Sequence, residues 1–209
     1  MTENGDPAHP LFAMIYDPAM ALVERTILKP HREYLARDLT GTVLDLGAGT
    51  GAMFPYFDGR ASVHATEPDR HMRDRARNRF PDAASEIELH DAGAADLPFP
   101  DDHFDAVVSS MVFCTVPDVA ASLSEVRRVV RPGGEFRFLE HVADDGWREA
   151  VQTTVAPAWK RLAGGCHLTR RTASLFASNE AFDVVEMDRF ELGVTPVRPF
   201  VRGRLRRRA

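Results

Sequence analysis

Hydrophobic and polar residues alternate along this chain with two different periods. Short apolar runs predict buried strands at residues 42–46, 62–66, 87–89, 104–109, 135–139, 182–187 and 199–205. Apolar residues at helical spacing predict helices over residues 11–38, 68–79, 117–130, 147–162 and 169–177. Strands that alternate with helices form a mostly parallel sheet covered on both faces, so we predict a doubly wound α/β fold with seven strands.

Proline and glycine set the limits of the predicted helices. Pro18 and Pro30 divide the leading helical stretch, and Pro55 allows only a brief helix after the first strand. Pro157 kinks a later helix, and the Arg-Pro-Gly-Gly turn at 131–134 stops the helix that precedes it. Because no internal repeat interrupts this pattern, we expect one continuous unit.

A glycine-rich turn, Asp-Leu-Gly-Ala-Gly-Thr-Gly at 45–51, follows the first predicted strand. Its glycines let the backbone turn tightly and approach a ligand without Cβ clashes. Glu67 lies about 20 residues further on, where a carboxylate accepts hydrogen bonds from the hydroxyls of a ribose. The turn and the acid together predict a site for a nucleoside cofactor, either a dinucleotide or S-adenosylmethionine.

The details of the turn favour S-adenosylmethionine. Dinucleotide turns typically have the pattern GxGxxG, and the helix that follows receives a pyrophosphate at its N-terminus. Here the pattern is GxGxG preceded by Asp45, and Pro55 leaves little helix for a pyrophosphate. S-adenosylmethionine carries no phosphate, but its sulfonium and ammonium groups favour a nearby carboxylate. A nicotinamide dehydrogenase remains the more distant alternative.

Composition and charge narrow the class of partner. A net charge of −5 argues against general nucleic-acid binding, which needs a basic face. Cys114 and Cys166 are the only cysteines and lack metal-ligand spacing, so we expect neither a disulfide framework nor a metal. No targeting segment is evident, and no stretch approaches the roughly 20 apolar residues of a membrane span. We therefore expect a cytoplasmic protein with a small-molecule partner.

Four stretches carry a family resemblance: VLDLGAGTG at 43–51, TEPD at 66–69, ADLPFPDDHFDAVV at 95–108 and EVRRVVRPGGEF at 125–136. With them the chain resembles the class I S-adenosylmethionine-dependent methyltransferases of the small ubiquinone-methyltransferase-like group, domain 11 type. Three more stretches are similar to the branch that contains the animal thiol S-methyltransferases: VVSSMVFCTVPD at 107–118, FLEHV at 138–142, and PAW followed by GGCHLTRRT over 157–172. Those animal enzymes carry an amino-terminal membrane anchor, which we expect this chain to lack.

The resemblance implies a Rossmann-like fold and a single methyltransferase domain with three functional segments. Residues 1–40 would form an N-terminal helical lid, 41–141 the cofactor-binding core, and 142–209 the substrate-side helices and C-terminal strands. Asp45 and the glycines would line the methionine part of the cofactor, Glu67 would hold the ribose, and Met72 would cover the adenine. The implied cofactor-binding residues are Tyr16, Asp45, Gly47, Ala48, Gly49, Glu67, Pro68, Met72, Gly93, Ala94, Ser109 and Ser110.

The acceptor side is predicted less directly. A thiol with a pKa near 8.5 is partly ionised at neutral pH, so its methylation needs only modest electrostatic help, for which His141 is the candidate catalytic residue. Phe113, Trp159, Cys166 and His167 are the candidate substrate residues; Cys166 need not form a covalent intermediate. The leading hypothesis is S-methylation of a small apolar thiol, in detoxification or secondary metabolism. The alternatives are O-, N- or C-methylation of a quinone, lipid or natural product, and a non-enzymatic S-adenosylmethionine sensor.

Overall fold

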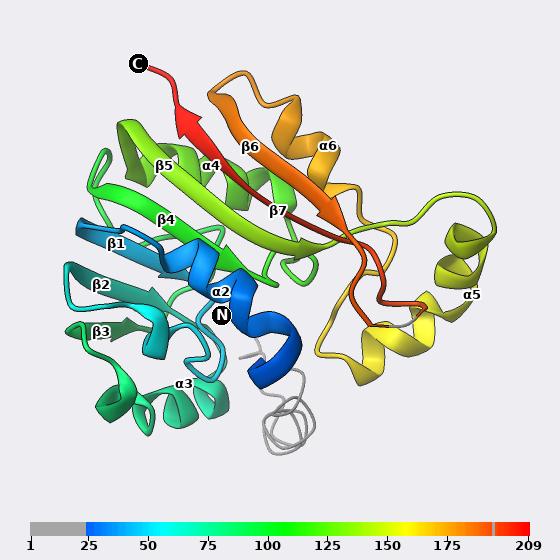
Figure 1. Ribbon diagram of the computed structural model, residues 1–209, viewed down its shortest axis with the longest axis horizontal. Coiled ribbons are helices and arrows are strands. Elements are labelled where there is room, and N and C mark those ends of the chain that lie inside the picture. Colours follow the sequence, from blue (N-terminus) through cyan, green and yellow to red (C-terminus); the bar gives the residue numbers. More distant parts are fainter. Residues whose placement is uncertain (1–23, 194) are drawn as a thin grey trace, which may run out of the picture.

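The computed structural model describes residues 24–193 and 195–209 of the chain. Its centre is one sheet of seven strands in the order β3-β2-β1-β4-β5-β7-β6 (Figure 1). The strands are β1 (Gly41–Leu46), β2 (Ala61–Thr66), β3 (Ile87–His90), β4 (Phe104–Ser110), β5 (Val130–His141), β6 (Phe182–Phe190) and β7 (Phe200–Arg207). The first five are parallel, whereas β7 runs antiparallel between β5 and β6. The prediction of a mostly parallel, seven-stranded sheet is confirmed.

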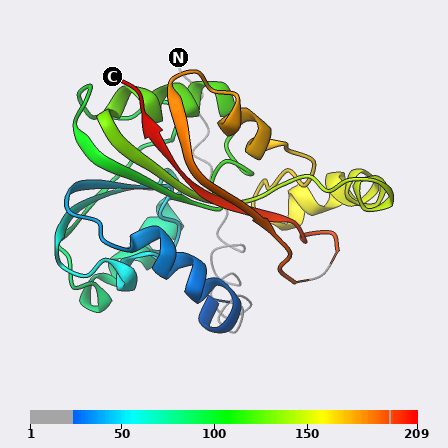
Figure 2. The same cartoon turned by 45° about the horizontal axis from the view of Figure 1, so that its top comes forward.

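Helices connect the strands and cover both faces of the sheet. The α-helices are α2 (Lys29–Ala36), α3 (Arg70–Arg77), α4 (Val119–Val129), α5 (Trp147–Leu162) and α6 (Thr172–Ala177). Three short helical turns are η1 (Glu24–Leu28), η2 (Phe54–Tyr56) and η3 (Phe80–Asp82). Figure 2 shows α2 and α3 on one side of the sheet and α4 and α6 on the other, with α5 beyond the end of the strands. No helix among the described residues is long and apolar enough to cross a membrane.

The two faces bury separate apolar clusters. One cluster joins β1 and β2 to α2 and η2 through residues such as Leu35, Val43 and Phe54. The other joins β4 and β5 to α4 and α6 through residues such as Val126, Phe136 and Phe176. Burial of apolar side chains on both faces explains the short, almost continuously apolar strands of the sequence.

The strand β5 differs most from its predicted bounds. The Arg-Pro-Gly-Gly turn at 131–134 was expected to separate a helix from a strand beginning at 135, but β5 already begins at Val130. The turn forms an irregularity within the strand, where the pairing of β4 with β5 shifts between Phe104 and Ala106. Gly134 is needed there, because a Cβ would lie 2.8 Å from the backbone oxygen of Asp105.

The described part of the leading helical stretch contains η1 and α2. Pro30 lies in the first turn of α2, where its missing N–H costs no hydrogen bond. Tyr16, the predicted cofactor-side residue of the lid, lies outside the described residues. Arg32 of α2 is buried and donates a hydrogen bond to the Ser110 hydroxyl at 3.2 Å, which ties this helix to the end of β4.

Candidate active site

The carboxyl ends of β1, β2 and β4 lie side by side in the middle of the sheet. β1 pairs with β2 on one side and with β4 on the other. The strand order therefore changes direction at β1, because β2 and β3 extend the sheet to one side and β4 and β5 extend it to the other. In open α/β sheets, ligands bind outside the carboxyl ends of the strands at such a reversal. The glycine turn, Glu67 and the pair Ser109 and Ser110 all follow or end these strands.

The glycine turn after β1 has one closed and one open side. Gly47 has a φ of 66°, and a Cβ there would meet the Val112 side chain at 2.7 Å, so only glycine fits. Gly49 has a φ of 58°, but a Cβ there would meet nothing within 4 Å. Between them, the Ala48 amide donates to the Thr66 carbonyl at 2.8 Å and fixes the turn to the end of β2. The backbone at Gly49 therefore leaves space for a ligand to approach closely.

Glu67 fastens the turn to the start of α3. Its carboxylate accepts hydrogen bonds from the amides of Gly49 at 2.9 Å and Asp69 at 2.8 Å. Burial raises the pKa of Glu67, while these two hydrogen bonds oppose the rise. A carboxylate offers about four lone-pair positions, so two remain for a ligand.

Asp45 lies near the end of β1 and is only 1% exposed. Its Oδ2 atom is buried and has no hydrogen-bond partner among the described residues. Burial raises the pKa of Asp45 to about 7; the nearby Arg32 cation opposes this rise and the Glu67 charge adds to it. An unpaired buried carboxylate is costly unless a positively charged group binds it.

The predicted adenine-side residues follow β2 and β3. Asp69 caps α3 by accepting hydrogen bonds from the backbone, among them the amide of Met72 at 3.1 Å. Met72 is buried and Pro68 is half-buried. Gly93 faces open space, and the partly buried Ala94 packs against the core cluster beside β4.

Arg73 was not predicted as a site residue, yet it organises this region. It is buried, donates to the backbone oxygens of Glu67 and Pro68 at 2.7 and 2.6 Å, and pairs with both carboxylate oxygens of Asp91 at 2.6 Å. Such a two-point contact fixes a guanidinium and a carboxylate in one geometry. It holds the end of β3 against the end of β2, so the acid at Asp91 is already occupied by a protein partner.

The two serines at the end of β4 point to different partners. The Ser109 hydroxyl is fully buried and donates to the carboxylate of Glu140 on β5 at 3.1 Å. The Ser110 hydroxyl is half-buried and accepts the hydrogen bond from Arg32. Ser110 therefore shares with Asp45 the neighbouring cation of Arg32, whereas Ser109 belongs to the interior.

Glu140 is the second functional residue that the sequence interpretation missed. It is completely buried and accepts hydrogen bonds from the amides of Val112, Phe113 and Cys114 at 3.0, 3.0 and 3.1 Å. Burial raises its pKa to about 7, and these hydrogen bonds oppose that rise. The side chain fixes the loop after β4 to the end of β5.

His141 ends β5 and is 1% exposed. No hydrogen bond of normal geometry reaches either ring nitrogen from the described residues, and the ring lies edge-on to Phe200 with centroids 5.8 Å apart. Burial lowers the pKa of His141 to about 4, against smaller opposing effects of the Pro196 carbonyl and Asp144. The imidazole is therefore neutral at pH 7 and supplies no positive charge.

Three of the four candidate substrate residues lie together. Cys166 and Trp159 belong to an apolar cluster that includes Cys114 and Leu168, and the His167 amide donates to the Cys114 carbonyl at 2.7 Å. The neighbouring Cys114 thiol lowers the pKa of Cys166, while the pKa of Cys114 is raised. This group connects the loop after β4 with α5 and the segment that follows α5.

Phe113 is placed elsewhere. It is fully buried in the core between the sheet and α6, where its ring packs edge-on against Phe176 with centroids 5.1 Å apart. Its backbone still belongs to the site region, because its carbonyl accepts a hydrogen bond from Arg170 at 2.7 Å. The contribution of this residue to the site is therefore made through its backbone.

Unpartnered buried polar atoms concentrate at the predicted site. Eight such side-chain atoms occur among the described residues, and four of them are Asp45 Oδ2, the two ring nitrogens of His141 and Trp159 Nε1. Buried polar groups are normally hydrogen-bonded, so each exception needs an explanation, and a bound ligand is one such explanation. All four belong to residues that the sequence had singled out.

Of the three missed residues, only Glu140 has a sequence signal. It continues the alternation of Phe136 and Phe138, whereas nothing in the apolar pattern marks Arg32 or Arg73 as buried. Buried charges are rare unless they are paired, so a charge at a buried position indicates a structural or functional partner. The sequence does not say which partner, because the contacts join residues far apart in the chain.

Comparisons with known proteins agree with this arrangement. The family model for a methyltransferase domain matches residues 44–138. The thiol S-methyltransferase TMT1A of Homo sapiens is 33% identical over 168 residues, which cover 77% of this chain and 68% of that protein. The phosphatidylethanolamine N-methyltransferase of Cereibacter sphaeroides is 36% identical over 119 residues, 56% of this chain and 59% of that protein. The solved structure of a SAM-dependent methyltransferase from Methanosarcina mazei has a TM-score of 0.66 at 16% identity, covering 84% of this chain and 96% of that one.

The chain belongs to the class I S-adenosylmethionine-dependent methyltransferases. Its cofactor is S-adenosylmethionine, and it is an enzyme that methylates a small-molecule acceptor. Human TMT1A and the bacterial N-methyltransferase, two relatives within this class, are named for different acceptor atoms. The expectation of a methyltransferase with a Rossmann-like fold is confirmed, and the dehydrogenase and non-enzymatic sensor alternatives are set aside.

Proposed function

We propose that the chain transfers a methyl group to the sulfur of a small, fairly apolar thiol. The observation that carries this proposal is the buried, neutral imidazole of His141 at the end of β5. The Val142 carbonyl accepts a hydrogen bond from the Gln152 side chain of α5 at 3.5 Å, and the Ala143 amide donates to the Arg170 carbonyl at 2.8 Å. The similarity to a human thiol S-methyltransferase supports the same acceptor.

The residues at the carboxyl ends of β1 and β2 fit S-adenosylmethionine. The unpartnered Oδ2 of Asp45 suits the ammonium of the methionine part, and the open face at Gly49 lets the cofactor approach the backbone. The two remaining lone-pair positions of Glu67 suit the ribose hydroxyls. The remaining cofactor-side positions are Gly47, Ala48, Pro68, Met72, Gly93, Ala94 and Ser110. When bound, the cofactor supplies a methyl group activated by a sulfonium.

The acceptor side is built to hold a thiol rather than to ionise it strongly. Since a thiol with a pKa near 8.5 is partly thiolate at neutral pH, the protein has only to orient the sulfur and exclude water. The thiol loses its proton to solvent before transfer, and the ring N–H of a neutral His141 donates a hydrogen bond to the thiolate and so aligns its sulfur with the methyl group. The cluster of Trp159 and Cys166 provides an apolar wall. Alignment of nucleophile and methyl group is a large part of the rate in such displacements.

A panel of acceptors of matched size tests the proposal. The purified chain is incubated with labelled S-adenosylmethionine and with an aliphatic thiol, a thiophenol, a phenol, an amine and a quinol. We expect labelled thioether, together with an equal amount of S-adenosylhomocysteine, from the thiols. Label on the phenol or amine and never on a thiol would refute the thiol assignment while leaving the methyltransferase class intact.

The second candidate is methylation of oxygen, nitrogen or carbon on a quinone, lipid or natural product. It is favoured by the similarity to a phosphatidylethanolamine N-methyltransferase at 36% identity. An amine acceptor would gain most from a free carboxylate on the acceptor side. The buried Glu140, however, is engaged by Ser109 and three backbone amides, so the thiol remains the better fit.

A further inference from the structure

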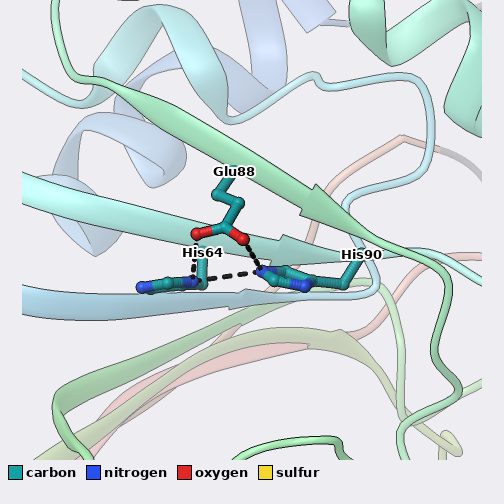
Figure 3. A group of neighbouring side chains, drawn as sticks. All are labelled: His64, Glu88 and His90. Atoms are coloured by element: carbon teal, nitrogen blue, oxygen red, sulfur yellow. Dashed lines mark hydrogen bonds and ion pairs between the residues drawn. The ribbon is translucent and has the colours of Figure 1, made fainter.

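Two histidines and a glutamate come together on β2 and the edge strand β3; the backbone of this group adjoins the cofactor side, where the Glu67 amide donates to the His90 carbonyl at 3.1 Å. His64 lies in β2, and Glu88 and His90 lie in β3. The register of these parallel strands pairs His64 with Glu88 and Thr66 with His90, so the three side chains project from the same face. Figure 3 shows their polar ends pointing toward one another.

The distances within this triad match those between ligands of one metal ion. His64 Nδ1 and His90 Nε2 are 3.1 Å apart, and the Glu88 carboxylate oxygens lie 3.3 Å from the first and 3.6 Å from the second. Zinc binds imidazole nitrogen at about 2.0–2.1 Å, so two ligands at a tetrahedral angle are about 3.3 Å apart. One ion placed between the three groups would reach all of them with little movement.

The two imidazole rings are held in place by aromatic packing. Phe99 lies edge-on to both rings, with centroids 5.5 Å from His64 and 4.9 Å from His90. Phe104 packs edge-on against His64 at 5.7 Å. Rings whose orientation is already fixed lose little freedom when they bind a metal.

The triad is also accessible. The His64 and His90 side chains are 19% and 22% exposed, and Glu88 is 66% exposed. A partly buried imidazole pair with one open side resembles the arrangement of three protein ligands plus water that zinc commonly adopts.

We propose that His64, Glu88 and His90 bind one divalent transition-metal ion of the zinc type. Two imidazoles and one carboxylate select such ions over Mg²⁺ and Ca²⁺, which prefer oxygen ligands. The bound ion joins β3, an edge strand of four residues, to β2. It takes no part in methyl transfer, and its role is to stabilise the outer edge of the sheet. The local sequence gives no hint of it, because the two histidines are 26 positions apart.

The test uses the full chain, with any polyhistidine tag removed, stripped of metal by a chelator. Titration with ZnCl₂ in a calorimeter is expected to give one site per chain with a Kd of micromolar or below. His64→Ala and His90→Ala should weaken this affinity at least about 100-fold, and Glu88→Gln about 10- to 100-fold. At zinc concentrations about 100 times the Kd, the melting temperature of the unmodified chain should rise by about 5 °C or more.

A neighbouring histidine provides the matched control. His103 lies beside the triad, with its ring centroid 5.8 Å from that of His64, but it is not one of the three ligands. His103→Ala should therefore keep the zinc affinity within about threefold. The assignment would be overturned if His103→Ala reduced the zinc affinity as much as His90→Ala, or if zinc binding survived both the His64→Ala and the His90→Ala substitutions.

A second measurement needs no variant. Co²⁺ added to the metal-free chain should develop the intense visible absorption of a four-coordinate ion, and Zn²⁺ should abolish it stoichiometrically. A spectrum that stays that of hydrated, six-coordinate Co²⁺ would overturn the proposal even if a triad variant failed to fold.

Discussion

The cofactor side and the acceptor side of the active site are constructed differently. Beside β1 and β2, the turn is held by hydrogen bonds that backbone amides, such as those of Gly49 and Asp69, donate to the Glu67 carboxylate. At the end of β5, the ring nitrogens of His141 are buried without a hydrogen bond of normal geometry among the described residues, and so is the indole nitrogen of the half-buried Trp159 on α5. The turn and Glu67 on the cofactor side are therefore held in place by the protein, with one carboxylate oxygen of Asp45 left for the cofactor, whereas the acceptor side leaves the His141 ring and the Trp159 indole nitrogen for the acceptor.

This difference suggests how specificity is divided between the two sides. A turn whose backbone is fixed by hydrogen bonds suits the cofactor, because the cofactor is the same molecule in every reaction cycle. An apolar wall with a neutral imidazole suits acceptors that share a reacting atom but differ in shape. Substitutions on the two sides should therefore fail in different ways, and the following experiments measure those differences.

The largest effect is expected from Gly47→Ala. The new methyl group would lie 2.7 Å from the Val112 side chain at a φ of 66°, so both a clash and an unfavourable backbone conformation follow. We expect a loss of about 2–5 kcal/mol in the free energy of unfolding, measured by urea denaturation. Gly49→Ala is the matched control: its methyl group meets no protein atom within 4 Å, so it should cost only about 1–2 kcal/mol of backbone strain.

The same pair of variants separates folding from binding. Since Gly49 faces the space assigned to the cofactor, Gly49→Ala should reduce the free energy of S-adenosylmethionine binding by more than it reduces the free energy of unfolding. Calorimetric titration measures the affinity. Equal destabilisation by both alanines, or undiminished cofactor affinity in Gly49→Ala, would contradict the assignment of open and closed sides.

Asp45→Asn comes next, with an expected 10- to 100-fold loss of S-adenosylmethionine affinity, because a charge-assisted hydrogen bond contributes about 1.5–3 kcal/mol. Burial raises the pKa of Asp45 to about 7, so the carboxylate is present above that pH and is lost as the pH falls below it. Affinity in the unmodified chain should therefore decline below pH 7, by up to about tenfold per pH unit. Asp45→Asn should bind weakly at every pH; a variant that keeps the same pH dependence would show that another group is responsible.

Local chemistry explains why the cofactor side was the more predictable of the two. The glycine turn needs positive φ angles and a close approach of the backbone, which glycine allows most readily. The glycines are neighbours in the sequence, so the turn can be recognised from a short stretch of residues. The strands were equally visible as short apolar runs. By contrast, the order of β6 and β7, the start of β5 at Val130, and the contacts of Glu140 depend on packing between distant segments. No local pattern encodes such packing.

His141→Ala is expected to have an intermediate effect that is confined to the acceptor side. Turnover of the thiol should fall about 10- to 100-fold through loss of alignment, while the affinity for S-adenosylmethionine stays unchanged. Burial lowers the pKa of His141 to about 4, so the ring is neutral above pH 5 and the rate should follow thiol ionisation alone from pH 6 to 9. A step near pH 6.5 in the rate profile that disappears in His141→Ala would show instead that the imidazole titrates in the normal range.

The smallest effect is expected from Cys166→Ala. Displacement at a sulfonium needs no covalent intermediate on the protein, and Cys166 lies in an apolar cluster with Cys114 and Leu168, so its sulfur acts as part of a wall. Turnover should stay within about threefold of the unmodified chain, and mass spectrometry of the enzyme quenched during turnover should find no methylated cysteine. Cys114→Ala serves as the comparison, since Cys114 is the more deeply buried of the two and should affect stability more than rate. If Cys166→Ala abolished turnover while cofactor binding and folding were retained, Cys166 would be a reacting group of the acceptor side. The two sides would then differ in their chemistry as well as in how their polar groups are held.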